Sequence, residues 1–238
     1  MKFARLAGFA IALYLFAASA YPQAVIVVHD PTLAPADVEE PRLSADDEAL
    51  MEKSVLPKVR KKLVTEACTD SYELKGFVEG AFSRPGAKQT LVFYQFCETG
   101  NGLGTIGIAL LDNGKVAGSY VAESGWAYSL TRLPDINQNG LDEFTLGYSG
   151  GMHQGQGGIG IDIVEFGRTG PRGLGWFHAE AITDTESDWG YKVTVKKGKT
   201  PVFYRQKYRS TEGSAWMKIG SNSRFGLKKT PDRYTAVK

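Results

Sequence analysis

Cysteine is scarce in this sequence, since Cys68 and Cys97 are the only 2 among 238 residues. At most one intramolecular disulfide can therefore form. Unpaired thiols are disfavoured in an oxidising compartment, so we expect Cys68 and Cys97 to be joined. A ring of this length stabilises a fold by about 3 to 4 kcal/mol through loop closure. The alternative is a pair of buried free thiols.

A strong excess of either charge is also missing. Lys2 and Arg5 belong to the N-terminal segment, and without them the chain keeps 28 − 2 = 26 basic residues against 26 acidic ones. A chain with this balance has no broad electrostatic attraction for a polyanion. We therefore expect no nucleic-acid partner.

The long hydrophobic run at the N-terminus is too short to span a membrane, which takes roughly 20 apolar residues. Residues 1–20 combine Lys2 and Arg5 with the apolar run LAGFAIALYLFA and end in Ala-Ser-Ala. This is the pattern of a cleaved secretory signal. No cysteine follows the cleavage point to carry a lipid. We expect an exported protein, periplasmic or extracellular, with no membrane insertion after cleavage.

Two short segments precede the main body of the chain. Residues 21–43 are acidic and rich in proline without a regular period, which predicts a flexible arm. Residues 44–67 predict a helical segment, because Ser44 and Asp47 form an acidic variant of a capping box and apolar residues then recur at helical spacing. Pro57 should kink this segment or divide it into two short helices.

The remaining residues, 68–238, predict a mainly β domain. Short stretches rich in Val, Ile, Phe, Tyr and Thr alternate with Gly-rich turns. The dipeptides Asn113-Gly114 and Lys197-Gly198 stand where tight hairpin turns need a positive φ. We expect antiparallel strands joined by hairpins.

Self-similarity divides this β domain. IGIALLDNGK (106–115) aligns with IGIDIVEFGR (159–168), and the upstream AFSRPGAKQTLVFY aligns with DINQNGLDEFTLGY. We interpret these as two blade-like antiparallel β repeats, at about 74–123 and 128–180, followed by a C-terminal hairpin region over 181–238. Because a closed propeller typically needs at least four blades, we expect an open or sandwich-like arrangement.

The stretch PDINQNGLDEF, residues 134–144, has the spacing of a calcium loop. Asp135, Asn137 and Asn139 stand at positions one, three and five, followed by glycine at position six, as at the start of an EF-hand. Calcium takes six to eight oxygen ligands, and alternate side chains of a tight loop can converge on it. Position twelve, where a bidentate Glu belongs, is Leu146.

Other groups of the same loop can replace the missing ligand. Glu143 at position nine is the expected carboxylate substitute, and the Leu141 carbonyl is expected at position seven. Asp142 should point away from Glu143, because neighbours on a strand face opposite sides. The alternative is an Asx-turn that enters a hairpin without an ion.

The loop DINQNGLDE, the strand FTL and the turn GYSGG together resemble the calcium loop of FG-GAP and VCBS-type repeats, which are blade units of integrin-α-like β-propellers. The resemblance covers residues 128–168 well and residues 74–115 poorly. The chain departs from the family pattern at Asn139, where the family has Asp, and it lacks a Phe-Gly pair before the loop. The resemblance implies a non-enzymatic binding or structural module, stabilised by weakly bound calcium, with an unknown protein or glycan ligand.

A rival interpretation is a small secreted serine hydrolase. The stretch GYSGG fits the Gly-x-Ser-x-Gly elbow around Ser149, and Asp162 and His178 follow in the order of that triad, with His153 as a second histidine. A hydrolase elbow leads into a helix, whereas these glycines lead into a predicted strand. We therefore prefer a repeat turn.

Three further motifs favour structural explanations. Gly-x-Gly-x-x-Gly occurs at 102–107 and at 155–160, but both lead into predicted strands and not into the helix that a dinucleotide site needs. DTESDWG (184–190) lacks the glycine of a cation loop and predicts an acidic turn or strand edge. Residues 192–210 carry seven basic residues and no acid. They could grip an anionic polymer, but we expect a solvated sheet edge.

Overall fold

The structure is a computed structural model that describes residues 25–33, 40–63, 68, 72–99, 103–151, 154, 156–183, 187–210, 215–230 and 233–238. The predicted secretory signal and His153 lie outside these residues, as do Asp184 and Glu186. Within the described ranges, no helix combines the length and the apolar character needed to cross a membrane.

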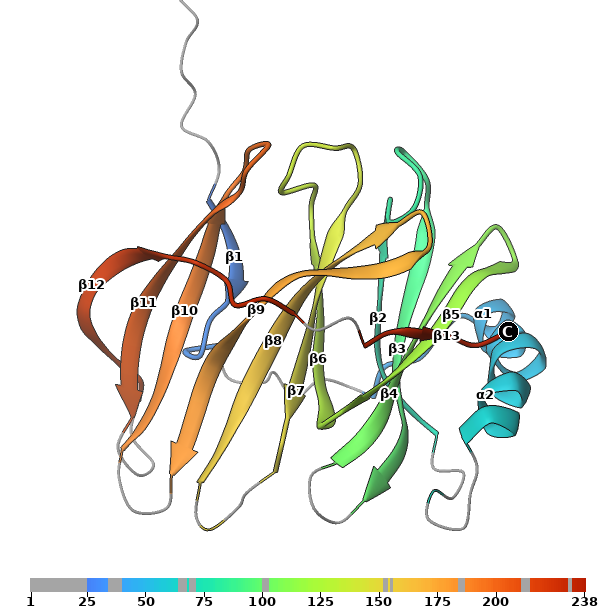
Figure 1. The fold of residues 1–238 in the computed structure, drawn as a ribbon, viewed down its shortest axis with the longest axis horizontal. Helices are drawn as coiled ribbons and strands as arrows, with labels where there is room; N and C mark the ends of the chain where they lie inside the picture. The colour runs from blue at the N-terminus through green and yellow to red at the C-terminus, as the bar shows by residue number, and fades with distance from the viewer. Residues whose placement is uncertain are drawn as a thin grey trace, which may run out of the picture.

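Two antiparallel sheets form the body, and neither closes into a barrel or propeller (Figure 1). The five-stranded sheet has the order β13-β5-β4-β3-β2, and the eight-stranded sheet has the order β12-β11-β10-β9-β8-β7-β6, with β1 added to β10. The prediction of a mainly β, open arrangement is confirmed. The strands of the five-stranded sheet are β2 (Glu73–Gly80), β3 (Gln89–Thr99), β4 (Leu103–Asp112), β5 (Lys115–Ser124) and β13 (Thr235–Ala236). Those of the eight-stranded sheet are β1 (Val25–His29), β6 (Trp126–Leu133), β7 (Glu143–Ser149), β8 (Gln156–Gly167), β9 (Gly170–Thr183), β10 (Asp188–Lys196), β11 (Val202–Ser210) and β12 (Met217–Phe225).

The two stretches that the sequence aligns each contain four antiparallel strands in the same order: β2 to β5, the first unit, and β6 to β9, the second unit. A glycine of the third strand lies opposite a tyrosine of the second in both: Gly107 pairs with Tyr94, and Gly160 pairs with Tyr148. A Cβ atom on either glycine would collide with the paired tyrosine ring. The aligned glycines therefore make room for the aligned tyrosines. Whether the two units arose by duplication stays a prediction.

The two units pack against each other around a buried apolar cluster. In this cluster Leu91 and Phe93 of β3 join Phe144 of β7 and Phe166 of β8, and all four side chains are buried. The Phe82 ring packs edge-on against Phe144 with centroids 5.9 Å apart. Because strands such as β3 and β4 are covered on both faces, their sequences are nearly continuous apolar runs.

The other face of the second unit is covered by the C-terminal strands. Strand β10 pairs with β9 only at Trp189 and Gly190, so the sheet is free to bend at this junction. A second buried cluster accordingly joins Ile161 and Ile163 of β8 to Val193 of β10 and to Phe203 of β11. Strands β10 to β12, which come after the two units in the sequence, thus form a third layer that packs on the second unit.

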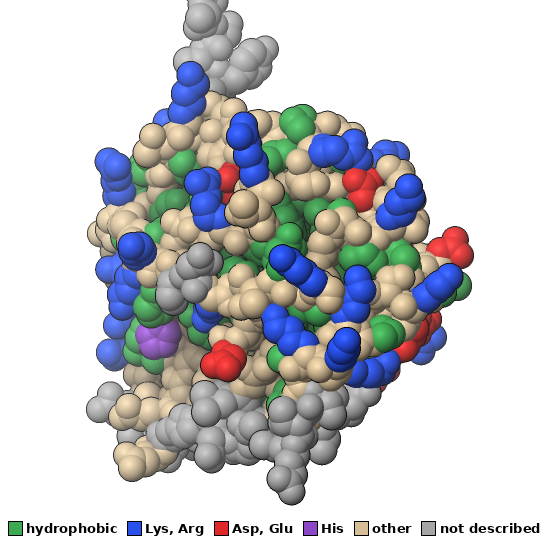
Figure 2. Space-filling view, turned by 45° about the vertical axis from the view of Figure 1, so that its right-hand side comes forward, with side chains coloured by type: hydrophobic (Ala, Val, Ile, Leu, Met, Phe, Trp, Pro, Cys, Tyr) green, Lys and Arg blue, Asp and Glu red, His purple; other side chains and the backbone are tan. Residues whose placement is uncertain are grey.

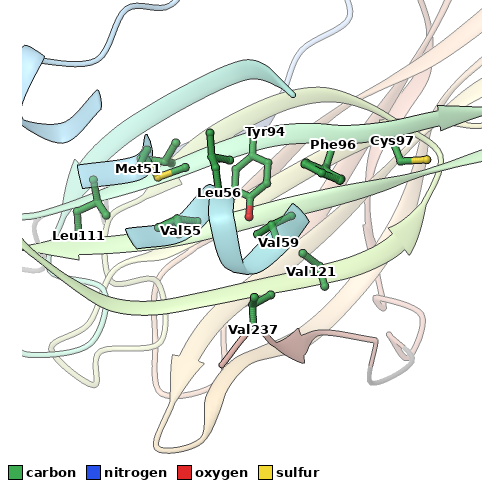
Figure 3. Close-up of a cluster of buried hydrophobic side chains, with 12 residues drawn as sticks. Met51, Val55, Leu56, Val59, Tyr94, Phe96, Cys97, Leu111, Val121 and Val237 are labelled. Carbon is green, nitrogen blue, oxygen red and sulfur yellow. The ribbon is translucent and has the colours of Figure 1, made fainter. Parts of the chain in front are cut away.

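A helical segment covers the outer face of the five-stranded sheet (Figures 1 and 3). It runs through α1 (Ala45–Leu50), a π-helical turn (Met51–Val55) and α2 (Leu56–Leu63). The hydroxyl of Ser44 accepts a hydrogen bond from the Asp47 N–H, which confirms the predicted cap. Its buried side chains pack on the sheet, and Figure 3 shows Met51, Val55, Leu56 and Val59 beside Tyr94, Phe96, Leu111 and Val121.

The helical segment continues through Pro57. The Leu56 N–H bonds to the Met51 carbonyl five residues earlier, so the chain passes through a wider turn just before the proline. Proline cannot donate a backbone hydrogen bond, and a π-turn at this point is one way for a helix to accommodate it. The predicted kink or division takes the form of a π-helical widening between two short α-helices.

The disulfide between Cys68 and Cys97 is present, as predicted, with Cα atoms 5.6 Å apart. It ties the connection that follows the helical segment to strand β3. The bridge fits an oxidising, exported compartment.

Two local predictions are wrong. Residues 21–43 were expected to form a flexible arm, but Val25–His29 is strand β1, which pairs with β10. Asp30 after this strand forms an ion pair with Lys192 at 2.7 Å. A short strand of this kind is stabilised by its partner strand, and five residues are too few to show a clear periodic pattern in the sequence.

The second wrong prediction concerns a turn. The Asn113-Gly114 turn has positive φ at both residues, as expected, but Lys197-Gly198 has positive φ at neither.

The C-terminal segment after β12 crosses the eight-stranded sheet and ends on the five-stranded one (Figure 1). Lys228 exchanges two backbone hydrogen bonds with Trp176 of β9. Further on, the Arg233 guanidinium pairs with the buried Asp162 carboxylate and lies over the Tyr148 ring. Strand β13 then pairs with β5. This segment links the two sheets.

Candidate metal-binding loop

The predicted calcium loop connects β6 to β7 at one end of the second unit. Its backbone turns through three residues with positive φ: Asp135 at 34°, Gln138 at 61° and Gly140 at 88°. Ile136 anchors the loop, since its side chain is fully buried. The left-handed conformations let successive backbone N–H groups turn inward.

The loop side chains accept hydrogen bonds from those N–H groups. The Asp135 carboxylate accepts from the N–H of Asn139 at 2.9 Å and of Gly140 at 3.1 Å. The Asn137 Oδ1 also accepts from Asn139, and the Asn139 Oδ1 accepts from Leu141 at 2.8 Å. These are Asx-type turns. The side chains of the loop therefore satisfy the hydrogen-bonding needs of its own backbone N–H groups.

Glu143 is the least satisfied member of the predicted ligand set. Its side chain is fully buried, and its Oε2 accepts from the Ile136 N–H at 2.8 Å. Its Oε1 is buried with no hydrogen-bond partner. Burial raises the pKa of Glu143 to about 7, and the nearby carboxylates of Glu165 and Asp135 add to the shift. A buried carboxylate in this setting carries a charge only at a free-energy cost.

Glu165 of β8 belongs to the same cluster, although the sequence interpretation did not include it. Its Oε2 accepts from the Nδ2 of both Asn137 and Asn139 at 2.5 Å, and its Oε1 accepts from Arg172 at 2.8 Å. The Glu165 side chain is only 4% exposed, whereas Arg172 is 66% exposed. The sequence alone could have pointed to Glu165, because the repeat alignment matches it with Asp112 and both copies thus have an acid at this position.

Asp142 faces away from this cluster, as the alternation of strand side chains predicts. Its Oδ2 accepts from the Ala81 N–H at 2.7 Å and from the Arg132 Nε at 2.9 Å. The Asp142 N–H donates to the Ala81 carbonyl. Asp142 thus fastens the second loop to the end of β2 and is not a ligand candidate.

The equivalent loop of the first unit, residues 81–88, is closed by a side-chain network of its own. The Gln89 Oε1 accepts from the Ser83 N–H at 2.8 Å, and its Nε2 donates to Asp112 at 2.9 Å. The Arg84 guanidinium donates to the same Asp112 oxygen at 2.7 Å. Gly86 has a φ of 70°, like its counterpart in the second loop. Here the neutral amide of Gln89 stands where the second loop has Glu143, and the exposed Arg84 pairs with the acid Asp112.

A complete cation site is not already assembled in the second loop. Among the described residues, no three His, Cys, Asp or Glu side chains are grouped so that they could hold a metal ion. A cation would have to draw the Asp135, Asn137 and Asn139 oxygens away from backbone N–H groups and towards Glu143. Carboxylate and amide oxygens are the donors that calcium prefers, so the donor chemistry fits calcium.

Ser149, Asp162 and His178, the residues of the rival hydrolase motif that the structure describes, each have other partners. The Ser149 Oγ accepts from the Gly151 N–H at 3.2 Å. His178 is exposed and packs edge-on against Trp189 with centroids 5.3 Å apart. The Asp162 carboxylate is held by Arg233 and Tyr234. Strand β8 begins at Gln156, where an elbow would require a helix.

The other motifs occupy strands and their ends. The glycine patterns lead into β4 and β8, so they precede no helix. Asp188 caps the end of β9 by accepting from the Thr183 N–H at 2.9 Å. The basic stretch 192–210 forms most of β10 and β11, and the outer strand of the sheet is β12. Its expected position at the sheet edge is therefore wrong, because β12 follows it.

Comparison of the chain with protein-family models, curated proteins and solved structures gives no significant match. The resemblance to FG-GAP and VCBS-type repeats is therefore carried by the loop spacing alone and stays a prediction.

Proposed function

We propose that the loop between β6 and β7 binds calcium through Asp135, Asn137, Asn139 and Glu143 with the Leu141 carbonyl, and that Glu165 contributes a further carboxylate. The protein would then be an exported, non-enzymatic binding or structural module whose second unit is stabilised by the ion. The observation that carries the proposal is the buried Glu143 Oε1, which has no hydrogen-bond partner, on a side chain whose pKa is raised by the carboxylates of Glu165 and Asp135.

The balance of charge supports a cation at this place. The carboxylates of Glu165 and Asp135 both raise the pKa of Glu143, and the basic partner of Glu165 is the largely exposed Arg172. Carboxylates gathered in a poorly solvated place repel each other and favour the neutral form. A divalent cation would neutralise them and supply the missing partner of Glu143.

The test is thermal unfolding in 10 mM calcium and in chelator. An ion that binds only the native state at 100 times its dissociation constant adds about 2.7 kcal/mol, which raises the melting temperature of a chain of this size by a few degrees. Asp135→Ala should abolish the increase. Magnesium should give a smaller one, because it demands a tighter octahedral shell and gives up its water reluctantly.

Three further variants sharpen the test. Glu165→Gln should reduce the calcium-dependent increase, whereas Asp112→Asn, the matching change in the first unit, should leave it intact. Asp142→Ala should lower the melting temperature in both conditions without changing the difference between them. Identical melting curves of the wild-type protein in calcium and in chelator would refute the site and leave the loop as an Asx-turn.

A further inference from the structure

A cavity of about 550 Å³ lies beside the loop, between β9 and the C-terminal strands. Its position follows from the bend in the eight-stranded sheet, because β11 and β12 fold over the second unit without filling the space at its end. The Gly198 N–H donates to the Ile136 carbonyl at 3.0 Å, which fixes the β10–β11 connection against the loop. The cavity is lined by four parts of the chain: the loop, β9, the β10–β11 connection with the start of β11, and the end of β12 with the residues after it.

Its inner wall is apolar and supported from behind. Phe203 is buried, and Leu174, Phe225 and Leu227 are half-buried and line the same space. The Phe225 ring packs edge-on against Phe177 and Phe203, with centroids 6.0 and 6.3 Å apart. Such packing holds the wall in place in the absence of a ligand.

The rim is cationic. Arg172, Lys199 and Arg224 reach it from β9, the β10–β11 connection and β12. Arg172 is paired with Glu165, whereas Lys199 and Arg224 are exposed and have no acidic partner among the described residues. Two positive charges at the mouth are thus left for an external anion. Figure 2 shows a face on which Lys and Arg side chains outnumber acidic ones, with hydrophobic side chains visible between them.

We propose that this cavity binds a small organic anion with an apolar body, which places its acidic group between Lys199 and Arg224 and its apolar part against Leu174, Phe225 and Leu227. The volume lies in the range of about 300 to 1,000 Å³ that is usual for small-ligand sites. A charged acceptor would receive charge-assisted hydrogen bonds from the two cations. The proposal does not depend on calcium in the neighbouring loop.

The test is calorimetric titration of the full mature chain, in chelator, with hexanoate, octanoate and decanoate. Burial of the apolar part predicts that affinity rises about fourfold with each added methylene group. Octylamine, which is cationic at neutral pH, and acetate, which has no apolar body, should each bind at least tenfold more weakly than octanoate. Octyl phosphate should also bind, and its affinity relative to octanoate shows which acidic group the rim prefers.

A double variant tests the location. Lys199→Gln with Arg224→Gln should weaken octanoate binding at least tenfold. The matched control, Lys218→Gln with Arg209→Gln, removes the same charges from the far end of the β11–β12 hairpin and should change nothing. Equal affinity for octanoate and octylamine, or unchanged octanoate binding in the rim variant, would overturn the proposal. If the wild-type protein binds octanoate but melts at the same temperature in calcium and in chelator, only the calcium site is refuted.

Discussion

The loops at the entrances of the two four-stranded units use the same turn geometry but differ in charge, which is balanced in the first loop and acidic in the second. Each turns at a glycine of positive φ, Gly86 or Gly140, and each buries an apolar anchor, Phe82 or Ile136. The first loop then closes on Gln89, Asp112 and Arg84, a set with one positive and one negative charge. The second loop closes on three acids and two asparagines.

This difference shows that the backbone corner needs no ion, because the first loop forms the corner with side chains alone. What distinguishes the second loop is a buried glutamate where the first has a glutamine. Buried acids with one poorly buried basic partner reduce the stability of the fold unless something neutralises them. Each loop has an exposed arginine paired with an acid, but only the second has further carboxylates beside that pair. The second loop therefore has the stronger chemical reason to bind a cation.

The largest expected effect comes from making the second loop resemble the first. Glu143→Gln should raise the free energy of unfolding in chelator at pH 8 by about 3 kcal/mol, because the wild-type pKa of about 7 lies well above its ordinary value. The native state binds the Glu143 proton more tightly than the unfolded state does. Wild-type stability should therefore fall as the pH rises from about 4.5 to 7, and urea unfolding at several pH values measures this.

The benefit of Glu143→Gln should shrink towards pH 5, where the wild-type carboxyl group is mostly protonated. The groups that face Glu143 are Glu165 and Asp135, with Arg172 acting through Glu165. The same variant should lose the calcium response. A destabilising effect of the variant at pH 8 would contradict the unpaired charge assigned to Glu143.

The glycine and tyrosine pairs offer a second comparison. Gly107→Ala should cost about 2 to 3 kcal/mol, because the new methyl group collides with the fully buried Tyr94 ring under the helical segment. Gly160→Ala meets the half-buried Tyr148 ring, which can move outward more easily, so its cost should be smaller. Urea unfolding of the two variants ranks them, and the reverse order would show that the first unit is the more adaptable.

Both turn glycines should be costly to replace, Gly140 slightly more so, because an added Cβ atom there would lie 3.3 Å from the Pro85 ring whereas Gly86 faces open space. Gly86→Ala and Gly140→Ala place a Cβ atom on a backbone with φ of 70° and 88°, and each should cost about 1 to 2 kcal/mol. Thermal unfolding in chelator measures both. A cost confined to Gly140→Ala would show that the two corners are not equivalent.

The smallest expected effect concerns Arg84, the exposed cation of the first loop. The Arg84 guanidinium and then the Gln89 amide hold the pKa of Asp112 below its ordinary value. Arg84→Gln should lower the urea midpoint slightly at neutral pH. The effect should vanish as the pH falls through the lowered pKa, since Asp112 is then protonated in the wild type too. A calcium response created by this variant would show that the first loop can also bind an ion.

Much of the fold could be predicted from local sequence. The strand-rich body, the hairpin at Asn113-Gly114, the Ser44 cap and the single possible disulfide are all present. Each depends on residues that are close in sequence or, for Cys68 and Cys97, on the absence of any other partner. Strand β1 could not be predicted, because its pairing energy comes from β10, which lies far along the chain.

The sequence by itself determined the corner at residues 134–142, since alternate Asx side chains and Gly140 encode the turn within the loop. Only the tertiary structure decided what surrounds that corner. Glu165 reaches it from the neighbouring strand β8, and the register of β7 against β8 sets which side chains meet there. The cavity beside it forms because a third layer bends over the second unit. Local turns depend on short-range sterics and hydrogen bonds, whereas charge environment and cavities depend on contacts that exist only after the layers pack.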